Sequence, residues 1–377
     1  MGLKGASVGV VGGGVAGLMF AICAQSRGAQ VTVFEQAPEI GEFGAGLQLS
    51  KNALRVFSAL KLHPDAEIPL SFPKKLHIYD IRTGMRLMSS DQNRSDEKVY
   101  AQVHRADLVG FLSAMARRLG VKVNLAARAK AGPGTIDTGE QAQSFDHVVI
   151  ASGVRSVAHT SAAPRFDGKV AWRATIPGTV SKAQTRVWIG PRRHLVAYPL
   201  RHGKLTNIVA VENSVTWDQE GWNHEGDPDL LRAAFSPACA EVADMLAQVT
   251  QTRRWALYTH PDISMVSCDG LPLVGDAAQT MLPFMAQGAA MAIEDAWALA
   301  SAIDQGAGLD RWAALRAARR NKVSEMAQAN GRIFHEARPW ALPFHRLGMW
   351  GLGRVWPNFG AARLRVVYDY DVTADFP

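Results

Sequence analysis

Residues 8–17 read VGVVGGGVAG, and this stretch decides the fold. Its first four residues are apolar and mostly β-branched, which predicts a short buried strand. Three glycines follow in the spacing GxGxxG, and residues 18–26 then continue as a helix. Gly12 permits a tight turn, Gly14 leaves room for a pyrophosphate against the backbone, and Gly17 lets the helix pack close to the sheet. Strand, turn and helix come in the order of a dinucleotide-binding unit.

A second strand is predicted at residues 30–34, and it ends at Glu35, which Gln36 follows. An acidic side chain at this strand end can accept hydrogen bonds from both hydroxyls of an adenosine ribose. It therefore favours FAD or NAD over a dinucleotide that carries a 2′-phosphate. A GxGxxG motif alone is a weak signal, but strand, helix and acid together favour dinucleotide binding over a simple glycine turn.

The last third of the chain holds a second motif. Residues 273–278 read LVGDAA, and residues 287–295 read QGAAMAIED. An apolar strand that ends in Gly-Asp, followed by a helix start, offers a fixed carboxylate and a row of unpaired backbone N–H groups. Those groups suit a polyhydroxy chain and a ring that gains negative charge, as in a flavin. Taken alone, this segment fits an ordinary buried strand, turn and helix with a small-residue packing face equally well.

The N-terminus also has the outline of a secretory signal, because Lys4 precedes an apolar stretch and residues 21–24 are small. Cleavage there would discard the glycine motif, so we expect a mature N-terminus. No segment approaches the roughly 20 uninterrupted apolar residues of a membrane span. We therefore expect a soluble, cytoplasmic protein without a transmembrane segment.

Composition agrees with a cytosolic enzyme. The chain has 377 residues, 47% of them hydrophobic, enough for one large domain or two fused ones. Cys23, Cys239 and Cys268 are far apart and belong to no CxxC motif or histidine cluster, so neither a disulfide framework nor a metal site is expected. The net charge of +7 is spread along the chain, which indicates attraction of anions and no nucleic-acid partner.

The middle of the chain predicts an inserted lobe. Short alternating, β-branched and aromatic runs between residues 170 and 254 indicate an antiparallel sheet that could roof a pocket. Apolar residues at helical spacing predict helices at residues 51–60, 104–119, 289–303 and 311–337. The fold class is α/β with an inserted α+β lobe. Its parts are a discontinuous Rossmann-like cofactor domain (residues 1–70, 98–168 and 262–337), an antiparallel-sheet substrate lobe (71–97 and 169–261) and a helical, basic and aromatic C-terminal tail (338–377).

Five ordered motifs together resemble a known family over nearly the whole chain. They are the glycine motif with Glu35, residues 44–54, Arg105 before Leu108, residues 146–156, and residues 275–295. The family is the single-component FAD-dependent aromatic hydroxylases, which share the p-hydroxybenzoate hydroxylase fold. The likeness is greatest to the salicylate and 3-hydroxybenzoate hydroxylase branch, with 6-hydroxynicotinate monooxygenase a near relative.

The resemblance implies that the protein is a monooxygenase of a small aromatic substrate, a phenol or hydroxy-aromatic acid. NADH or NADPH would deliver hydride to FAD, the reduced flavin would capture O2 as a C4a-hydroperoxide, and the ring would take the distal oxygen. The resemblance places FAD against Gly12, Gly14, Val15, Ala16, Gly17, Glu35, Gln36, Gly46, Leu47, Arg105, Asp276, Gly288, Ala289 and Ala290.

Three positions depart from the family pattern. Ser152 stands where the family usually has aspartate, Gln279 where it has histidine, and Ala197 where related hydroxylases often place a histidine near the substrate. A second hypothesis is therefore a flavoprotein that has lost ring hydroxylation and acts as a slow NAD(P)H oxidase, a tailoring enzyme or a sensor. A third, a nicotinamide-only dehydrogenase, is disfavoured by the Gly-Asp segment at 275–276.

No catalytic base can be assigned from the sequence, since His194 and His202 are expected to be surface or turn histidines. Arg173 or Arg192 could attract a substrate carboxylate, although an exposed arginine is the commoner outcome. The predicted pocket wall is formed by Tyr198, Pro283, Met285 and Ala197, and the alternative is that these residues simply belong to the core.

The tail from Arg338 to Arg365 mixes arginines with Trp340, Phe344 and other aromatic residues. Such a mixture could lie on a membrane surface. Glycines and prolines are expected to break any long amphipathic helix here. Packing on the domain or contact within a homodimer is therefore favoured over peripheral membrane binding.

Overall fold

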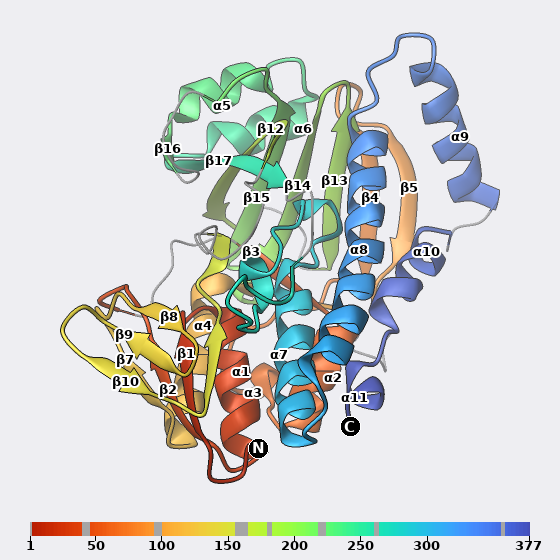
Figure 1. The fold of residues 1–377 in the computed structure, drawn as a ribbon. Helices are drawn as coiled ribbons and strands as arrows, with labels where there is room; N and C mark the ends of the chain where they lie inside the picture. The colour runs from red at the N-terminus through yellow and green to blue at the C-terminus, as the bar shows by residue number, and fades with distance from the viewer. Residues whose placement is uncertain are drawn as a thin grey trace.

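The structure is a computed structural model that describes residues 2–39, 46–93, 100–154, 165–178, 183–217, 224–259, 264–355 and 359–377. Figure 1 shows a lower part around a parallel sheet and an upper part around a larger sheet. Helix α8 (Leu309–Phe334) runs alongside both. Within the described segments, no helix is long and apolar enough to cross a membrane.

The lower sheet is parallel throughout. Its strand order is β11 (His147–Ile150), β1 (Ser7–Val11), β2 (Gln30–Phe34) and β7 (Lys122–Asn124). Helix α1 (Val15–Ser26) is apolar on nearly all sides, which fits its burial. The small sheet β8–β10 (Lys130–Gly132, Thr135–Asp137, Ala142–Ser144) approaches β1 at Gly9, where an added Cβ would lie 2.5 Å from the Ile136 side chain. Both faces of the sheet are therefore covered, as parallel sheets require.

Two glycines of the first motif hold the turn, as expected. Gly12 has φ +115°, and a Cβ there would lie 2.4 Å from the Ala151 carbonyl oxygen. A Cβ on Gly17 would lie 1.9 Å from the Gly12 carbonyl oxygen. Only glycine fits such close contacts between helix and turn.

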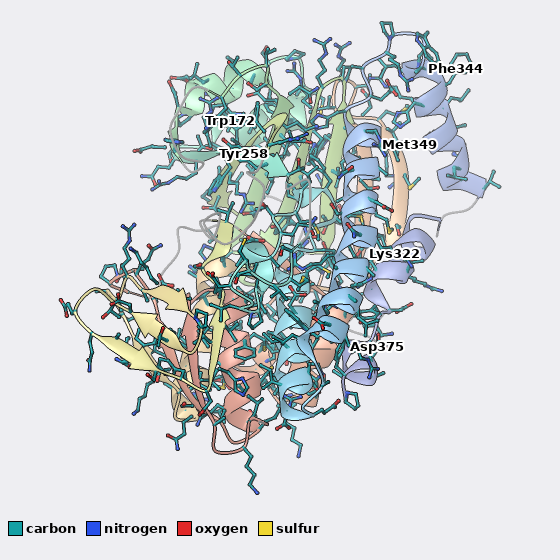
Figure 2. All side chains as sticks on the ribbon, in the orientation of Figure 1. Trp172, Tyr258, Lys322, Phe344, Met349 and Asp375 are labelled. Atoms are coloured by element: carbon teal, nitrogen blue, oxygen red, sulfur yellow. The ribbon has the colours of Figure 1, made fainter. Side chains whose placement is uncertain are left out.

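The upper sheet has the order β16-β17-β12-β15-β14-β13-β4-β5. Its pairs are antiparallel except β13 with β4. Its strands are β4 (Lys75–Asp80), β5 (Arg86–Asp91), β12 (Arg165–Pro177), β13 (Gln184–Gly190), β14 (Arg193–Leu200), β15 (Leu205–Asn213), β16 (His224–Gly226) and β17 (Thr252–Thr259). The alternating runs predicted after residue 170 form β12 to β15. One face packs with helices α5 (Pro228–Ala234) and α6 (Ala240–Ala247) into a core that includes Trp172, which Figure 2 places in this upper part.

The remaining elements connect the two parts. Strands β3 (Gly46–Ser50) and β6 (Tyr100–His104) pair antiparallel and lead into helices α2 (Lys51–Ala59) and α4 (Arg105–Arg118), and the short α3 (Pro64–Glu67) follows α2. Helix α7 (Gly288–Asp304) packs against α1, α2 and α8. The predicted strand before Asp276 is reduced to two isolated bridges, Leu273 with Ile150 and Pro272 with Val266, and η3 (Gly275–Ala277) follows directly.

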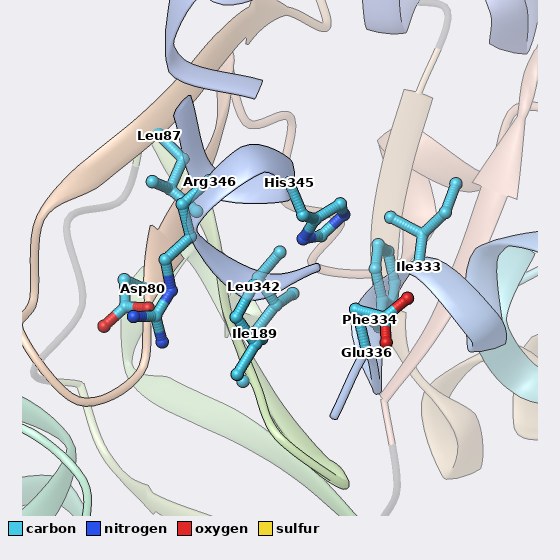
Figure 3. A pocket seen from close by; sticks show the side chains of 10 residues that line it. Asp80, Leu87, Ile189, Ile333, Phe334, Glu336, Leu342, His345 and Arg346 are labelled. Atoms are coloured by element: carbon cyan, nitrogen blue, oxygen red, sulfur yellow. The ribbon is translucent and has the colours of Figure 1, made fainter. Parts of the chain in front are cut away.

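The tail forms α9 (Leu342–Val355), α10 (Phe359–Tyr368) and α11 (Val372–Asp375). The predicted C-terminal helices are thus confirmed. Glycines and prolines were expected to break any long amphipathic helix here, yet α9 runs through three glycines over its 14 residues. Close packing explains the last one, since a Cβ on Gly353 would lie 3.0 Å from the Leu87 carbonyl oxygen of β5. At the start of α9, Arg346 pairs with Asp80 at 2.5 Å, as Figure 3 shows.

Candidate functional site

A cavity of about 810 Å³ lies between the two parts of the molecule. Its lower wall comes from the loop between β1 and α1, the starts of β3 and α4, and the start of α7. Its upper wall comes from β4, β5 and β12–β15, and inner residues of α9 and α10 close one side. This volume lies in the upper part of the range for cofactor and ligand pockets, and the cavity opens where the two parts meet.

Nine of the residues assigned to FAD by the resemblance line this cavity: Gly14, Val15, Ala16, Gly46, Leu47, Arg105, Asp276, Gly288 and Ala289. Gly14 is the N-cap of α1, and nothing lies within 4 Å of the position that a Cβ would take. A phosphate can therefore approach the bare backbone at a helix N-terminus. The local geometry fits the pyrophosphate of a dinucleotide.

The other five residues of that set do not line the cavity. Gly12 and Gly17 pack the turn, and Ala290 is buried inside α7. Glu35 lies at the end of β2, where its carboxylate accepts hydrogen bonds from the Gly13 N–H at 2.6 Å and the Ala37 N–H at 2.8 Å. Gln36 is exposed beside it. Residues 44, 45, 155 and 156 of the family motifs lie outside the described residues.

Two arginines and an aspartate set the charge of the cavity. Arg105 begins α4, Arg173 lies on β12 and Asp276 lies on η3, and all three line the cavity. Burial lowers the pKa of Arg105, and the positive charge of Arg173 lowers it further. The negative charge of Asp276 acts in the opposite direction. Two guanidinium groups against one carboxylate leave a positive wall, which suits a diphosphate. Arg192 has φ +60° in an exposed turn away from this wall.

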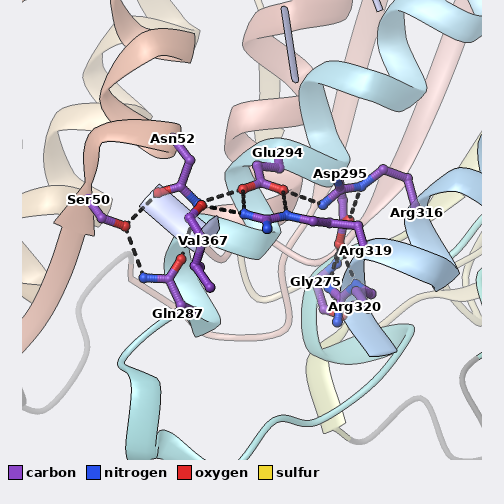
Figure 4. A network of polar contacts seen from close by, with 10 residues as sticks. All are labelled: Ser50, Asn52, Gly275, Gln287, Glu294, Asp295, Arg316, Arg319, Arg320 and Val367. Carbon is purple, nitrogen blue, oxygen red and sulfur yellow. Dashed lines mark hydrogen bonds and ion pairs between the residues drawn. The ribbon is translucent and has the colours of Figure 1, made fainter. Parts of the chain in front are cut away.

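A buried polar network fixes the second motif (Figure 4). Glu294 and Asp295 on α7 are fully buried, and three arginines of α8 neutralise them. Asp295 accepts from the Gly275 N–H at 3.2 Å, and Arg320 donates to the Gly275 carbonyl at 2.9 Å. The turn that carries Asp276 is therefore held from its backbone.

The same network reaches the start of α7. Asn52 donates to Glu294 at 2.5 Å and to the Gln287 side-chain oxygen at 3.1 Å, and Gln287 donates to Ser50 at 2.9 Å. With its side chain engaged, Gln287 caps a helix whose first residues, Gly288 and Ala289, line the cavity. The unpaired N–H groups of a helix start stabilise negative charge.

Gln279, which stands where the family has histidine, is buried in this region. Its backbone carbonyl accepts from Arg320 at 3.1 Å. Side chains of α7 and α8 hold this turn through its backbone N–H and carbonyl groups. The turn therefore does not require the histidine that the family usually has at position 279.

One pocket prediction is wrong. Tyr198, Pro283 and Met285 line the cavity, but Ala197 is fully buried in the core on the other face of the sheet. Successive residues of a strand point to opposite faces, so on β14 His194, Val196 and Tyr198 face the cavity while Leu195 and Ala197 face the core. Alanine at position 197 therefore removes no side chain from the cavity.

The expectation for His194 is also wrong, because this residue is only 3% exposed and lines the cavity. Its Nδ1 lies 2.6 Å from Nε2 of His335, and His335 Nδ1 lies 2.6 Å from Oδ1 of Asn213. Burial lowers the pKa of His194 well below its ordinary value, and the nearby His335 and Lys169 lower it further. Sequence spacing could not reveal this contact, since 141 positions separate the two histidines. His202 lies in an exposed turn, as expected.

Comparisons with known proteins agree with this geometry. Residues 5–328 match the family described as FAD binding domain. The chain is 31% identical over 353 residues to 3-amino-4-hydroxybenzoate 2-monooxygenase PtnB3 of Streptomyces platensis, which covers 87% of this chain and 88% of that protein. It is 31% identical over 351 residues to 3-hydroxybenzoate 6-hydroxylase of Polaromonas naphthalenivorans (strain CJ2), covering 86% and 87%. In fold it resembles a salicylate hydroxylase substrate complex, with TM-score 0.79, 19% identity, and coverage of 99% and 97%.

Proposed function

The chain belongs to the FAD-dependent aromatic monooxygenases, and on that premise we propose that its cavity holds FAD along the lower wall and a phenolic substrate against the upper wall. The family resemblance and the FAD and NAD(P)H expectations are thereby confirmed, and the nicotinamide-only dehydrogenase is wrong. The observation that carries the proposal is one continuous cavity joining the open backbone of Gly14 to the side chains of His194 and Tyr198.

For the cofactor, we propose that Gly14 and the start of α1 bind the pyrophosphate and that Arg105 neutralises it. Glu35 at the end of β2 would hold the adenosine ribose, and Asp276 the ribityl chain. The N–H groups of Gly288 and Ala289 would face the pyrimidine edge of the ring. When bound, FAD accepts hydride from NADH or NADPH, and its reduced form reacts with O2. The protein supplies position, charge and exclusion of water.

For the substrate, the names of both similar enzymes specify a benzoate ring with a hydroxyl group. We propose a hydroxylated aromatic acid or phenol here as well, packed against Tyr198, Pro283 and Met285. Hydroxylation favours an electron-rich phenolate, which requires a base. We propose His194 as this base, since its ring lines the same wall and burial favours its neutral form.

The hypothesis of a flavoprotein that has lost hydroxylation is weakened, because one of its two supports was Ala197. The test is to purify the protein with FAD and follow NADH and NADPH oxidation with 3-hydroxybenzoate, salicylate, 3-amino-4-hydroxybenzoate, hydroxypyridines and quinolones. Product mass increased by one oxygen supports the proposal. NAD(P)H oxidation that yields only peroxide across the panel supports lost hydroxylation, and a folded protein that takes up no FAD overturns both.

We also propose a homodimer formed through the exposed stripe of α9, defined here as Phe344, Leu347 and Val355. These residues recur at helical spacing, and Phe344 is 75% exposed. The arginines around the stripe are already engaged. Arg346 pairs with Asp80 at 2.5 Å, Arg338 with Glu336 at 2.6 Å, and Arg354 stacks 4.2 Å from the centre of the Trp350 ring. Because these arginines already interact with groups of the same chain, we infer that the stripe contacts a second copy of the protein and not an anionic lipid surface.

Light scattering after size exclusion tests the dimer, which Phe344→Glu should convert to monomer. Val215→Glu, at a residue that is 97% exposed in another loop, should not. A monomeric wild type, or sedimentation with phosphatidylserine vesicles, overturns this proposal. The free thiols of Cys23 and Cys239 support the proposed cytoplasmic location.

The proposed division into a discontinuous cofactor domain and a substrate lobe is supported by separate cores. One cluster unites β1, α1, α4, β11 and α7, and another unites the upper sheet with α5 and α6. Limited proteolysis with and without FAD tests the boundaries, because FAD should protect the three segments of the cofactor domain together.

A further inference from the structure

We propose that Asn213 and His335 act as positioning residues that fix the tautomer of His194 and lead its proton to the surface. This inference deepens the proposed function, because it assigns two further residues to the work of the proposed base. The three side chains come from the end of β15, the residue after α8, and β14. They form one line from an exposed residue to the cavity wall.

The direction of the hydrogen bonds follows from the outermost group. The side-chain oxygen of Asn213 can only accept, so His335 must donate to it from Nδ1–H across 2.6 Å. A neutral imidazole carries one proton, which leaves Nε2 of His335 as an acceptor. His194 must then donate from Nδ1–H across the second 2.6 Å contact. Nε2 of His194 is left with a free lone pair, the form that a base needs.

The surroundings keep both rings neutral. The rings of Phe284 and Phe334 lie 5.4 and 5.3 Å from the His194 ring, measured between centroids. Burial, with the charges of Lys169 and Arg193, lowers the pKa of His335 from 6.5 to about 3. Lys169 comes from β12 and is paired with Asp167 at 2.6 Å, and Arg193 comes from β14. A proton arriving at this pair is therefore driven onward and not stored.

The proton balance is simple. The substrate hydroxyl gives its proton to Nε2 of His194, His194 passes its Nδ1 proton to Nε2 of His335, and His335 releases its Nδ1 proton to water beside the exposed Asn213. One proton leaves the substrate and one enters solvent. The chain then has reversed polarity, which rotation of the Asn213 amide matches. The same transfers in reverse, which take one proton from water and return one to the oxygen of the product, restore the Nδ1–H form of both rings.

The decisive measurement needs no substrate. Nitrogen-15 NMR of histidine-labelled holoprotein at pH 7.5 distinguishes Nδ1–H from Nε2–H imidazoles, and His194→Gln and His335→Gln assign the two signals. Both rings should be in the Nδ1–H form. Asn213→Leu should abolish that preference, whereas His202→Asn, at an exposed turn, should leave both signals unchanged. Nε2–H tautomers or a charged imidazole in the wild type would overturn the inference.

A second arm measures turnover with whichever member of the aromatic panel is hydroxylated. Asn213→Leu should lower kcat roughly 10-fold or more and leave KM within about twofold, because binding is untouched. Asn213→Asp should move the acid limb of the kcat profile to higher pH, since a carboxylate stabilises the imidazolium. Unchanged kcat and pH profile in both variants would refute the relay. No hydroxylated product from wild type, with Nδ1–H tautomers intact, would refute the proposed function and leave the tautomer assignment standing.

Discussion

The Asp295 carboxylate accepts a hydrogen bond from the Gly275 backbone N–H at 3.2 Å, and this contact joins the helix α7 to the turn that carries Asp276. Asp295 is fully buried and is also held by Arg316 and Arg320. The turn that places Asp276 in the cavity wall is thus held by buried charged side chains that do not line the cavity themselves.

Asp295→Asn should lower the free energy of unfolding by about 3–5 kcal/mol, because it leaves buried guanidinium charge without its partner. Urea unfolding followed by circular dichroism measures this. The matched control is Asp304→Asn at the end of the same helix, where the ion pair with Arg27 is 4.0 Å long and partly exposed. The control should cost less than about 1 kcal/mol. Equal losses in both variants would contradict the role given to Asp295.

The Asp295 contribution should also depend on pH. Burial alone would raise the pKa of this carboxyl, but Arg320 and Arg316 hold it below the ordinary value of 3.8. A lowered folded-state pKa gives stability that is present above the ordinary value and lost as pH falls through the folded value. Wild type should therefore lose stability more steeply than Asp295→Asn below pH 4. Parallel stability curves in that range would show that the carboxylate is not stabilised.

His335 should make the protein less stable in mild acid. Its pKa is lowered to about 3 by burial, with Lys169 and Arg193 contributing, so between pH 6.5 and 3 the unfolded chain binds more protons. The stability is fully present above pH 6.5 and should fall by about 2 kcal/mol between pH 7 and pH 5 through this residue. In the His335→Gln variant, the free energy of unfolding should decrease less between pH 7 and pH 5. Urea titrations of the wild type and of His335→Gln at four pH values test this prediction.

Two glycines of the first motif should respond differently to alanine. Gly17→Ala places a Cβ 1.9 Å from the Gly12 carbonyl and should cost more than about 2 kcal/mol of apoprotein stability. Gly14→Ala meets nothing within 4 Å and should leave the apoprotein stable, but should raise the Kd for FAD at least tenfold by blocking the backbone. Thermal melting without FAD and flavin fluorescence titration separate the two effects. Unaltered FAD affinity in Gly14→Ala would place the pyrophosphate elsewhere.

Substitutions at Ala197 and Tyr198 should also have different effects, the first on stability and the second on turnover. Ala197→Leu overpacks the lobe core and should cost about 1–3 kcal/mol of stability. Tyr198→Phe removes a hydroxyl from the cavity wall and should change KM or kcat with little effect on melting. Ala197→His should supply no base to the cavity, so it should fail to restore turnover to a His194→Gln variant. Recovery of turnover in that double variant would contradict the strand register described here.

Local sequence carried much of the fold. The glycine spacing, the apolar run before it and Glu35 predicted β1, α1 and β2, because turn geometry and strand burial depend on neighbouring residues. Helical spacing likewise predicted α2, α4, α7 and α8 within a few residues of their ends. The turn at 275–277 and the start of the helix α7 within residues 275–295 were predicted for the same reason.

Other features required the folded chain. Ala197 was placed in the pocket because a sequence shows that a strand alternates but not which face meets the cavity. His335 was missed because its partner Asn213 lies 122 positions away and no local pattern links them. The tail was predicted to be helical, but the contact of Gly353 in α9 with Leu87 of β5 was not, because no local pattern links two positions so far apart in the chain.

The sequence by itself determined the cofactor class, since a dinucleotide is bound largely by backbone groups whose geometry is encoded in short glycine motifs. Only the tertiary structure decided which side chains face the substrate cavity and how His194 is oriented. Those properties depend on packing between segments that are far apart in the chain. The strand face that meets the cavity and the hydrogen bond to His194 determine which groups are available for chemistry.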